Sequence, residues 1–254
     1  MTGKRNRRIL LRAALCLCGA YFLYLSARTT VLLKNAKTLI ANAEKFPREY
    51  SISETKQGEI TYVVLGDSTA VGVGAARLED GYAFQTATAF ADFKKRRVRV
   101  VNLAISGAVL NDVLEKQLPQ LAKLKPDLIT VSIGANDATH FSSIEKYRVQ
   151  MKLLIGKLGE SKAQVLIATT PDIFQAPALP LPLALAANRR AKMQNAILSK
   201  AATNSKIQVV DLFNRGKLIY AQNPNLYAAD FFHPASDGYQ IWARLFIAEL
   251  TAKP

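Results

Sequence analysis

The chain has 254 residues, a length that suits one domain of roughly 200 residues plus an appended segment. Half of the residues are hydrophobic and the mean hydropathy is +0.06, which excludes a largely disordered chain. The formal net charge is +15, but residues 1–37 carry eight basic and no acidic residues, so about half of the basicity belongs to that segment.

Residues 1–28 read as a basic leader followed by an apolar run. The run, 9–27, is interrupted only by Arg12 and Ser26. As a helix it would span about 28 Å, close to the ~30 Å hydrocarbon thickness of a bilayer. The basic flank predicts a single-pass membrane anchor with a cytoplasmic N-terminus and the rest of the chain on the outer side, periplasmic in a bacterium. The alternative is secretion after signal-peptide cleavage, although no clean Ala-x-Ala site follows the run.

The positions of the cysteine and basic residues bear on whether the chain binds a metal, a cofactor or nucleic acid. Both cysteines, Cys16 and Cys18, lie in the apolar run, so the remainder has neither a disulfide framework nor a cysteine-based metal site. The basic cluster at 94–97 is interpreted as a solvated helix end. The alternative interpretation is a weak attraction of this cluster to anionic lipid or glycan. We therefore expect no metal, no cofactor and no nucleic-acid partner.

The segment 29–58 is expected to connect the anchor to the domain. Residues 31–46 have helical periodicity and end before Pro47, while 47–58 is polar and is interpreted as a linker.

The domain, 59–254, alternates apolar β-type runs with longer helical runs. Such alternation predicts an α/β fold with a five-stranded parallel sheet and helices on both faces. Pro119 is expected to split or kink the helix in which it lies. The expected strands are 60–65, 97–103, 128–133, 164–169 and 207–212, and the expected helices are 77–93, 109–124, 143–159, 185–204 and 236–251.

Polar or glycine-containing clusters follow three of these strands, and a fourth precedes the last helix. In a parallel sheet the site lies outside the carboxyl ends of the strands. Serine needs an adjacent base to act as a nucleophile, the base needs an orienting acceptor, and the oxyanion needs preorganised donors. Each residue alone also suits a turn or a helix cap. The clusters are Gly66-Asp67-Ser68, Asn102 to Gly107, Gly134 to Asp137, and Asp230 to Pro234.

The chain has only two histidines to act as the base for Ser68. His233 follows Asp230 by three residues, so a turn would bring the carboxylate to its ring. His140, with Asp137 nearby, is the weaker alternative.

Taken together, the four clusters resemble the SGNH hydrolase family, also called GDSL esterases and lipases. The matching blocks are Gly66-Asp67-Ser68, Gly107, Gly134-x-Asn136-Asp137 and Asp230-x-x-His233, in the family's order over residues 66–239. The resemblance implies a flavodoxin-like three-layer α/β/α fold. It also implies Ser68 as nucleophile, His233 as base, Asp230 as its partner, and an oxyanion hole of the Ser68 and Gly107 N–H groups and the Asn136 side chain. Thr69 departs from the family's frequent leucine, which leaves subfamily and substrate open.

The resemblance implies hydrolysis of acyl esters, with esterase, lysophospholipase and thioesterase activities all within the family. The alternative enzymatic function is that of an O-acetyl esterase acting on envelope glycans. The alternative outside the enzymes is a membrane-tethered, non-catalytic binding protein. The Pro-rich stretch 171–187 either lines an acyl pocket or touches the bilayer, or is an apolar connection packed on the core. Its candidate substrate-binding residues are Ile173, Phe174, Leu179 and Leu181.

Overall fold

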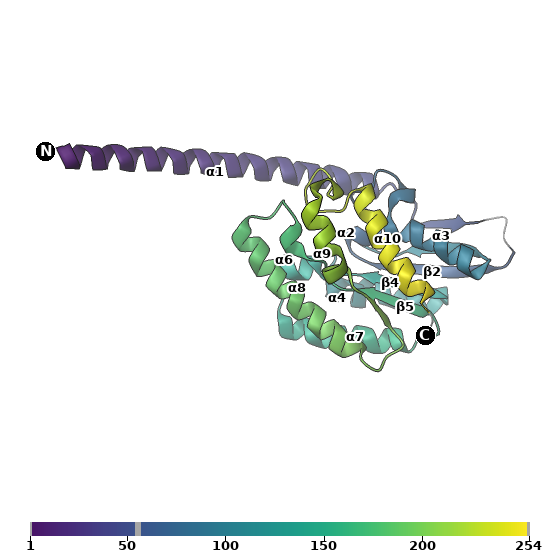
Figure 1. Ribbon diagram of the computed structural model, residues 1–254. Helices are drawn as coiled ribbons and strands as arrows, with labels where there is room; N and C mark the ends of the chain where they lie inside the picture. The colour runs from purple at the N-terminus through teal and green to yellow at the C-terminus, as the bar shows by residue number, and fades with distance from the viewer. Residues whose placement is uncertain (1, 54–56, 253–254) are drawn as a thin grey trace.

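The computed structural model describes the backbone of residues 2–53 and 57–252, and the side chains of these residues apart from 2–18 and 20. One continuous helix, α1 (Thr2–Ala43), extends well beyond the domain (Figure 1). Where side chains are described, no helix is long and apolar enough to cross a membrane. The predicted span, 9–27, lies mostly outside those side chains, so the anchor stays a prediction.

A six-stranded sheet forms the centre of the domain, in the order β1-β3-β2-β4-β5-β6. β1 is antiparallel to β3, and the other five strands are parallel. The strands are β1 (Glu49–Ile52), β2 (Glu59–Gly66), β3 (Arg97–Asn102), β4 (Leu128–Ser132), β5 (Gln164–Ala168) and β6 (Gln208–Val210).

The α/β prediction is therefore confirmed, but the prediction of five strands is wrong. The sixth strand, β1, lies inside the stretch 47–58 that was interpreted as a polar linker. It reaches the sheet because its backbone pairs with β3 from Glu49 opposite Val101 to Ile52 opposite Val98. Three of its four residues are not fully buried, so apolar patterning gave little signal for it.

Alternating residues of β2 face the two layers of helices, because successive side chains of a strand point to opposite faces. Tyr62 and Val64 join one core cluster with α3 (Tyr82–Lys94) and α10 (Ser236–Thr251). Val63 and Leu65 join the other with α7 (Ile144–Gly159) and α8 (Leu181–Ala202). The sheet thus lies between two helical layers, with α3 and α10 on one face (Figure 1).

The order of the five parallel strands places β2 between β3 and β4, which is the flavodoxin-like arrangement. The connections leaving β2 and β3 pack on opposite faces of the sheet, so the carboxyl end of β2 is the switch point at which a ligand site is expected. Ser68 lies immediately beyond that end, which is where ligands bind in sheets of this kind.

Between β3 and β4 the chain forms several short helical pieces instead of the single helix predicted over 109–124. The predicted break at Pro119 is confirmed, because a 3₁₀ turn carries that residue. A five-residue π turn precedes it. The pieces are α4 (Leu110–Asp112), the π turn Val113–Gln117, the 3₁₀ turn Leu118–Gln120 and α5 (Leu121–Leu124).

Several short elements carry the loops at the carboxyl edge. The helix α9 follows β6 where no helix was expected, and α8 begins four residues earlier than its predicted start. The remaining elements are α2 (Ser68–Val71), α6 (Ala135–Thr139), α9 (Leu212–Gln222), and the 3₁₀ turns η1 (Leu78–Asp80), η4 (Ile173–Gln175) and η5 (Pro224–Leu226).

Candidate active site

Ser68 lies at the turn from β2 into α2. The chain reverses at Gly66, whose φ of +142° is rarely adopted by residues with a side chain. A Cβ at Gly66 would lie 2.1 Å from the carbonyl oxygen of Ser132 on β4, so a side chain would collide with the neighbouring strand. Asp67 caps α2 by accepting a hydrogen bond from the N–H of Thr69. The tight turn leaves Ser68 at the edge of the sheet, at 6% exposure.

A second turn, 165 residues away in sequence, brings His233 to this serine. His233 Nε2 lies 2.8 Å from Ser68 Oγ, and His233 Nδ1 lies 2.5 Å from Asp230 Oδ2. The other carboxylate oxygen of Asp230 accepts hydrogen bonds from the N–H groups of Phe232 and His233, each 3.0 Å long. The turn therefore holds the carboxylate against the ring, as the spacing of Asp230 and His233 predicted.

The charge state of Asp230 follows from these contacts. Burial raises its pKa, but the hydrogen bond and charge of His233 and the two backbone N–H groups outweigh burial and lower the pKa below its ordinary value. The carboxylate is therefore ionised near neutral pH. An ionised Asp230 favours the tautomer with the proton on His233 Nδ1, which leaves Nε2 free to accept the proton of Ser68.

Asp67 is a second buried carboxylate beside the serine. Its Oδ1 accepts hydrogen bonds from the Thr69 N–H at 2.9 Å and the Thr69 hydroxyl at 2.8 Å. The Thr69 hydroxyl also lies 2.9 Å from Ser132 Oγ. Burial raises the pKa of Asp67 despite these bonds. Thr69 thus joins Asp67 to β4 by hydrogen bonds that the leucine common at this position of the family could not make.

The loops that carry Gly107 and Asn136 are joined to each other and to β2. Asn136 Nδ2 donates to the carbonyl oxygen of Ala108 at 2.9 Å, and the N–H of Leu110 donates to Asp137 Oδ2 at 2.9 Å. The N–H of Ile105 donates to the carbonyl oxygen of Gly66 at 3.1 Å. The predicted oxyanion residues therefore come from loops held around the same strand end.

Two backbone donors at this edge are unpaired. Neither the Ser68 nor the Gly107 N–H has an acceptor among the described residues. Gly107 is exposed with φ +81°, and nothing lies within 4 Å of the position where its Cβ would be. The space in front of Gly107 is thus open to a bound group that accepts hydrogen bonds.

A family model for the GDSL-like lipase/acylhydrolase family matches residues 64–241, which contain all of these groups. The chain belongs to this family. It is a GDSL-type ester hydrolase.

The GDSL hydrolase is similar to one curated protein, the GDSL-like esterase Rv1075c of Mycobacterium tuberculosis (strain ATCC 25618 / H37Rv). The two are 26% identical over 265 residues, which cover 97% of this chain and 83% of the relative. Solved structures share the fold. The α/β hydrolase LAE5 from the Lake Arreo metagenome has a TM-score of 0.60 at 24% identity, over 75% of this chain and 94% of its own. The acetylxylan esterase Axe2 of Geobacillus stearothermophilus has a TM-score of 0.56 at 20% identity, over 76% and 95%.

Gln117 of the GDSL hydrolase supports the serine turn, and sequence reasoning missed it. The residue is fully buried and ends the π turn. Its Oε1 accepts from the Gly66 N–H and its Nε2 donates to the Gly66 carbonyl oxygen, each at 2.8 Å. A glutamine inside a predicted helix gives no local sign of this contact, because its partner lies 51 residues away.

His140, the weaker candidate for the base, lies at the end of α6 and is exposed. The structure places His233, not His140, beside Ser68. Among the residues described, no group of three or more His, Cys, Asp or Glu side chains is arranged to hold a metal ion.

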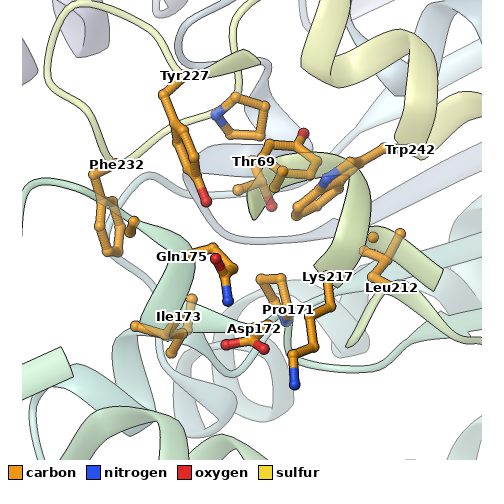
Figure 2. Close-up of a pocket in the computed structure, with 15 residues that line it drawn as sticks. Thr69, Pro171, Asp172, Ile173, Gln175, Leu212, Lys217, Tyr227, Phe232 and Trp242 are labelled. Carbon is orange, nitrogen blue, oxygen red and sulfur yellow. The ribbon is translucent and has the colours of Figure 1, made fainter. Parts of the chain in front are cut away.

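A narrow cavity of about 50 Å³ lies beside the Ser68 and His233 turns of the GDSL hydrolase (Figure 2). Thr69 and Pro234, the residues that follow Ser68 and His233, line it. Figure 2 shows Tyr227 reaching across the cavity toward Gln175. The remaining lining residues are Ala135, Pro171, Asp172, Ile173, Ala176, Leu212, Gly216, Lys217, Tyr220, Phe232 and Trp242.

The four candidate residues of the Pro-rich stretch lie in different surroundings. Ile173 is buried and lines the cavity. Leu179 packs on a small core cluster with Ile173 and Phe213. Phe174 and Leu181 are exposed. The stretch therefore combines core packing with side chains that face solvent, and only one of the four lines the cavity.

Proposed function

We propose that this chain cleaves carboxylic esters through an acyl-enzyme formed on Ser68, with His233 as base and Asp230 as its orienting partner. The proposal rests on two hydrogen bonds that share His233, one between Asp230 Oδ2 and His233 Nδ1 and one between His233 Nε2 and Ser68 Oγ. Serine becomes a competent nucleophile near neutral pH when a neutral imidazole accepts its proton as it attacks.

The reaction follows from these positions. Ser68 Oγ bonds to the ester carbonyl carbon while its proton passes to His233 Nε2. The carbonyl oxygen becomes an oxyanion, which accepts from the Ser68 and Gly107 N–H groups and from Asn136 Nδ2. The bond to the alkoxy group then breaks, and the alcohol leaves with the proton from Nε2. Water, deprotonated by the same nitrogen, releases the carboxylic acid and restores Ser68.

The unpaired N–H groups of Ser68 and Gly107 support this assignment of the oxyanion hole. Donors already in place need no reorganisation as charge develops, which makes such groups effective in a transition state. The donor that Asn136 directs to Ala108 O is one of its two amide hydrogens, and the second remains for the oxyanion.

The test uses the full-length chain and nitrophenyl esters of increasing acyl length. We expect the unchanged chain to hydrolyse these esters and to be labelled covalently at Ser68 by a fluorophosphonate, as mapped by mass spectrometry. Both the hydrolysis and the labelling should disappear in Ser68→Ala. The matched control is Ser106→Ala, because Ser106 lies in the Gly107 loop and its hydroxyl has no partner among the described residues. Equal activity in Ser68→Ala and the unchanged chain would overturn the proposal, and absence of both activity and labelling would favour a non-catalytic binding protein.

The substrate class is tested by comparing lysophospholipids, acyl thioesters and sugar acetates with the same preparation. We propose acyl lipids or thioesters as the class, because exposed apolar side chains such as Phe174 and Leu181 lie in the stretch next to the cavity. Selective release of acetate from glycans would replace this assignment with an O-acetyl esterase.

We also propose that residues 9–27 anchor the chain in a membrane with residues 1–8 in the cytoplasm, because their apolar length matches a bilayer. Retention of the full-length protein in the membrane fraction after alkaline extraction is the expected result. Release into the soluble fraction with a shortened N-terminus would instead indicate cleavage and secretion.

A further inference from the structure

Exposed apolar side chains surround the proposed catalytic centre. Six of them lie in segments that follow the carboxyl ends of strands: Ile105 after β3, Phe141 after β4, Phe174, Leu181 and Leu185 after β5, and Phe231 after β6, all between 39% and 62% exposed. We call this set the apolar rim. Because the carboxyl ends of parallel strands meet at one edge of the sheet, the rim and Ser68 share that edge.

Two phenylalanines of the rim have a backbone conformation that bulky residues rarely adopt. Phe141 has φ +56° and Phe231 has φ +54°, both in the left-handed region. This backbone conformation is unfavourable for a large apolar residue. Because the Phe141 and Phe231 rings are 46% and 43% exposed, full burial of the rings does not offset its cost. Strained residues of this kind gather at functional sites. Here the strained residues expose two aromatic rings to solvent, one directly after Asp230 in the chain and one in the loop that follows α6, the helix of Asn136.

Hydrogen bonds fix the rim segments to one another and to α1. The N–H of Ala178 donates to the carbonyl oxygen of Phe231 at 3.1 Å, so the Pro-rich stretch is held against the Asp230–His233 turn. Arg28 of α1 donates to the carbonyl oxygen of Pro177 at 2.5 Å, and Asn35 donates to that of Ala229 at 2.8 Å. The rim is thus adjacent to the helix that carries the apolar run.

Two arginines contact the rim loops. The guanidinium of Arg190 lies 5.6 Å from the centre of the Phe141 ring, within the range of a cation–π contact. Arg28 lies at the Pro-rich stretch. The rim loops, residues 104–109, 140–143, 171–185 and 228–235, contain only two acidic residues, Asp172 and Asp230, and both are buried. Apolar tips that contact cations, on loops whose own carboxylates are buried, complement an anionic lipid surface.

We propose that the apolar rim docks on the surface of a bilayer containing anionic lipid, so that the catalytic centre opens toward the lipid interface. The rim side chains enter the boundary between headgroups and acyl chains, while Arg190 and Arg28 face the phosphates. The proposal deepens the proposed function, since it makes esters at a membrane interface the substrates presented to Ser68. The docking itself requires no catalysis.

The test measures contact between the rim and lipid directly. Phe174→Cys and Leu185→Cys are made separately in a full-length chain with Cys16→Ser and Cys18→Ser, and each is labelled with an environment-sensitive fluorophore. Val149→Cys is the matched control, because Val149 is 66% exposed on α7 and lies outside the rim loops. Each protein is reconstituted into vesicles of phosphatidylcholine with or without phosphatidylglycerol, containing a lipid with a nitroxide quencher on its acyl chain.

We expect quenching at positions 174 and 185 to be at least threefold greater than at 149, and to fall when phosphatidylglycerol is left out. Equal quenching at all three positions would overturn the docking surface. Equal quenching with and without phosphatidylglycerol would overturn the requirement for anionic lipid. A spectral change without lipid that rises with protein concentration would instead assign the rim to self-association. The same quenching is expected in Ser68→Ala, so a failure of the enzymatic proposal is distinguishable from a failure of docking.

Discussion

The side-chain amide of Gln117 forms two hydrogen bonds with the backbone of Gly66, one to its N–H and one to its carbonyl oxygen, each 2.8 Å long. The pairing of β2 with β3 ends two residues earlier, at Val64 opposite Asn102. Gln117 therefore binds the Gly66 backbone on the side that β3 no longer covers, where the Gly66 carbonyl oxygen also accepts from the Ile105 N–H at 3.1 Å. This amide fixes the backbone two residues before Ser68 without touching the substrate.

Gln117→Leu is expected to lower kcat about tenfold and to leave the buried Gly66 N–H without its partner, while the Gly66 carbonyl oxygen keeps the hydrogen bond from the Ile105 N–H. The unfolding free energy should fall by about 1–3 kcal/mol, the usual cost of an unsatisfied buried polar group. Kinetics on a soluble nitrophenyl ester and denaturant unfolding measure the two effects. Gln120→Leu is the matched control, because Gln120 is exposed and donates only to Lys116. A loss of stability with unchanged kcat would limit Gln117 to a structural role.

Gly74→Ala is expected to displace the His233 turn and to lower kcat much more than Gly72→Ala. Both glycines have left-handed φ values, +99° and +95°, so the backbone strain of the two substitutions is similar. A Cβ at Gly74 would lie 2.2 Å from the Pro234 carbonyl oxygen and 3.2 Å from His233 Cβ, whereas at Gly72 the nearest atom would be 3.7 Å away. Comparable kcat values for the two variants would show that the contact does not position His233.

Asn136→Ala is expected to lower kcat by ~10²–10³, the usual effect of removing one oxyanion donor, with KM little changed. The reason is that the donor stabilises charge that exists only in the transition state. Steady-state kinetics with a soluble ester measure the effect, and Asn225→Ala on an exposed turn is the control. An unchanged kcat would remove Asn136 from the oxyanion hole.

The stability of the fold should depend on pH through Asp137. Burial raises the pKa of Asp137 to about 6, despite the hydrogen bond from Leu110. A carboxyl with a raised folded-state pKa contributes stability that is full below the unfolded pKa, near 3.8, and is lost as the pH rises through about 6.

Asp137→Asn keeps an acceptor for Leu110 but has no charge to bury. Its stability relative to the unchanged chain should therefore rise by up to about 2–3 kcal/mol between pH 4 and pH 7.5. Denaturant unfolding at the two pH values measures the difference. Asp237→Asn, at an exposed position in α10, should show no such change. A pH-independent difference for Asp137→Asn would contradict the raised pKa.

The sequence indicated the main parts of the site because three of them closely follow a predicted strand. Ser68, Gly107 and Asn136 lie after β2, β3 and β4, so strand prediction and residue type together were sufficient to group them. Asp230 and His233 were found by their mutual spacing, although no strand ends directly before them. These positions follow from the order and spacing of residues along the chain, which can be read directly from the sequence.

The features that escaped prediction depend on partners that are distant in sequence. β1 is a strand because β3 offers its edge, and Gln117 matters because Gly66, which pairs with Ser132 of β4, has no strand partner on its β3 side. The left-handed conformations of Phe141 and Phe231 have no signature in residue type, since glycine or asparagine is usual there. Such properties arise from tertiary contacts, which a single sequence read by pattern does not specify.

The short connection between α1 and β1 has a mechanical consequence. Only the five residues 44–48 separate the helix from a strand that is paired along its full length with β3. Arg28 and Asn35 of α1 also donate to the carbonyl oxygens of Pro177 and Ala229, so the helix is attached to the domain at several points beyond the short connection. An enzyme anchored in this way would keep Ser68 at a constant height above the bilayer. It would reach new esters by lateral diffusion in the plane of the membrane, and esters held far from that plane would escape it.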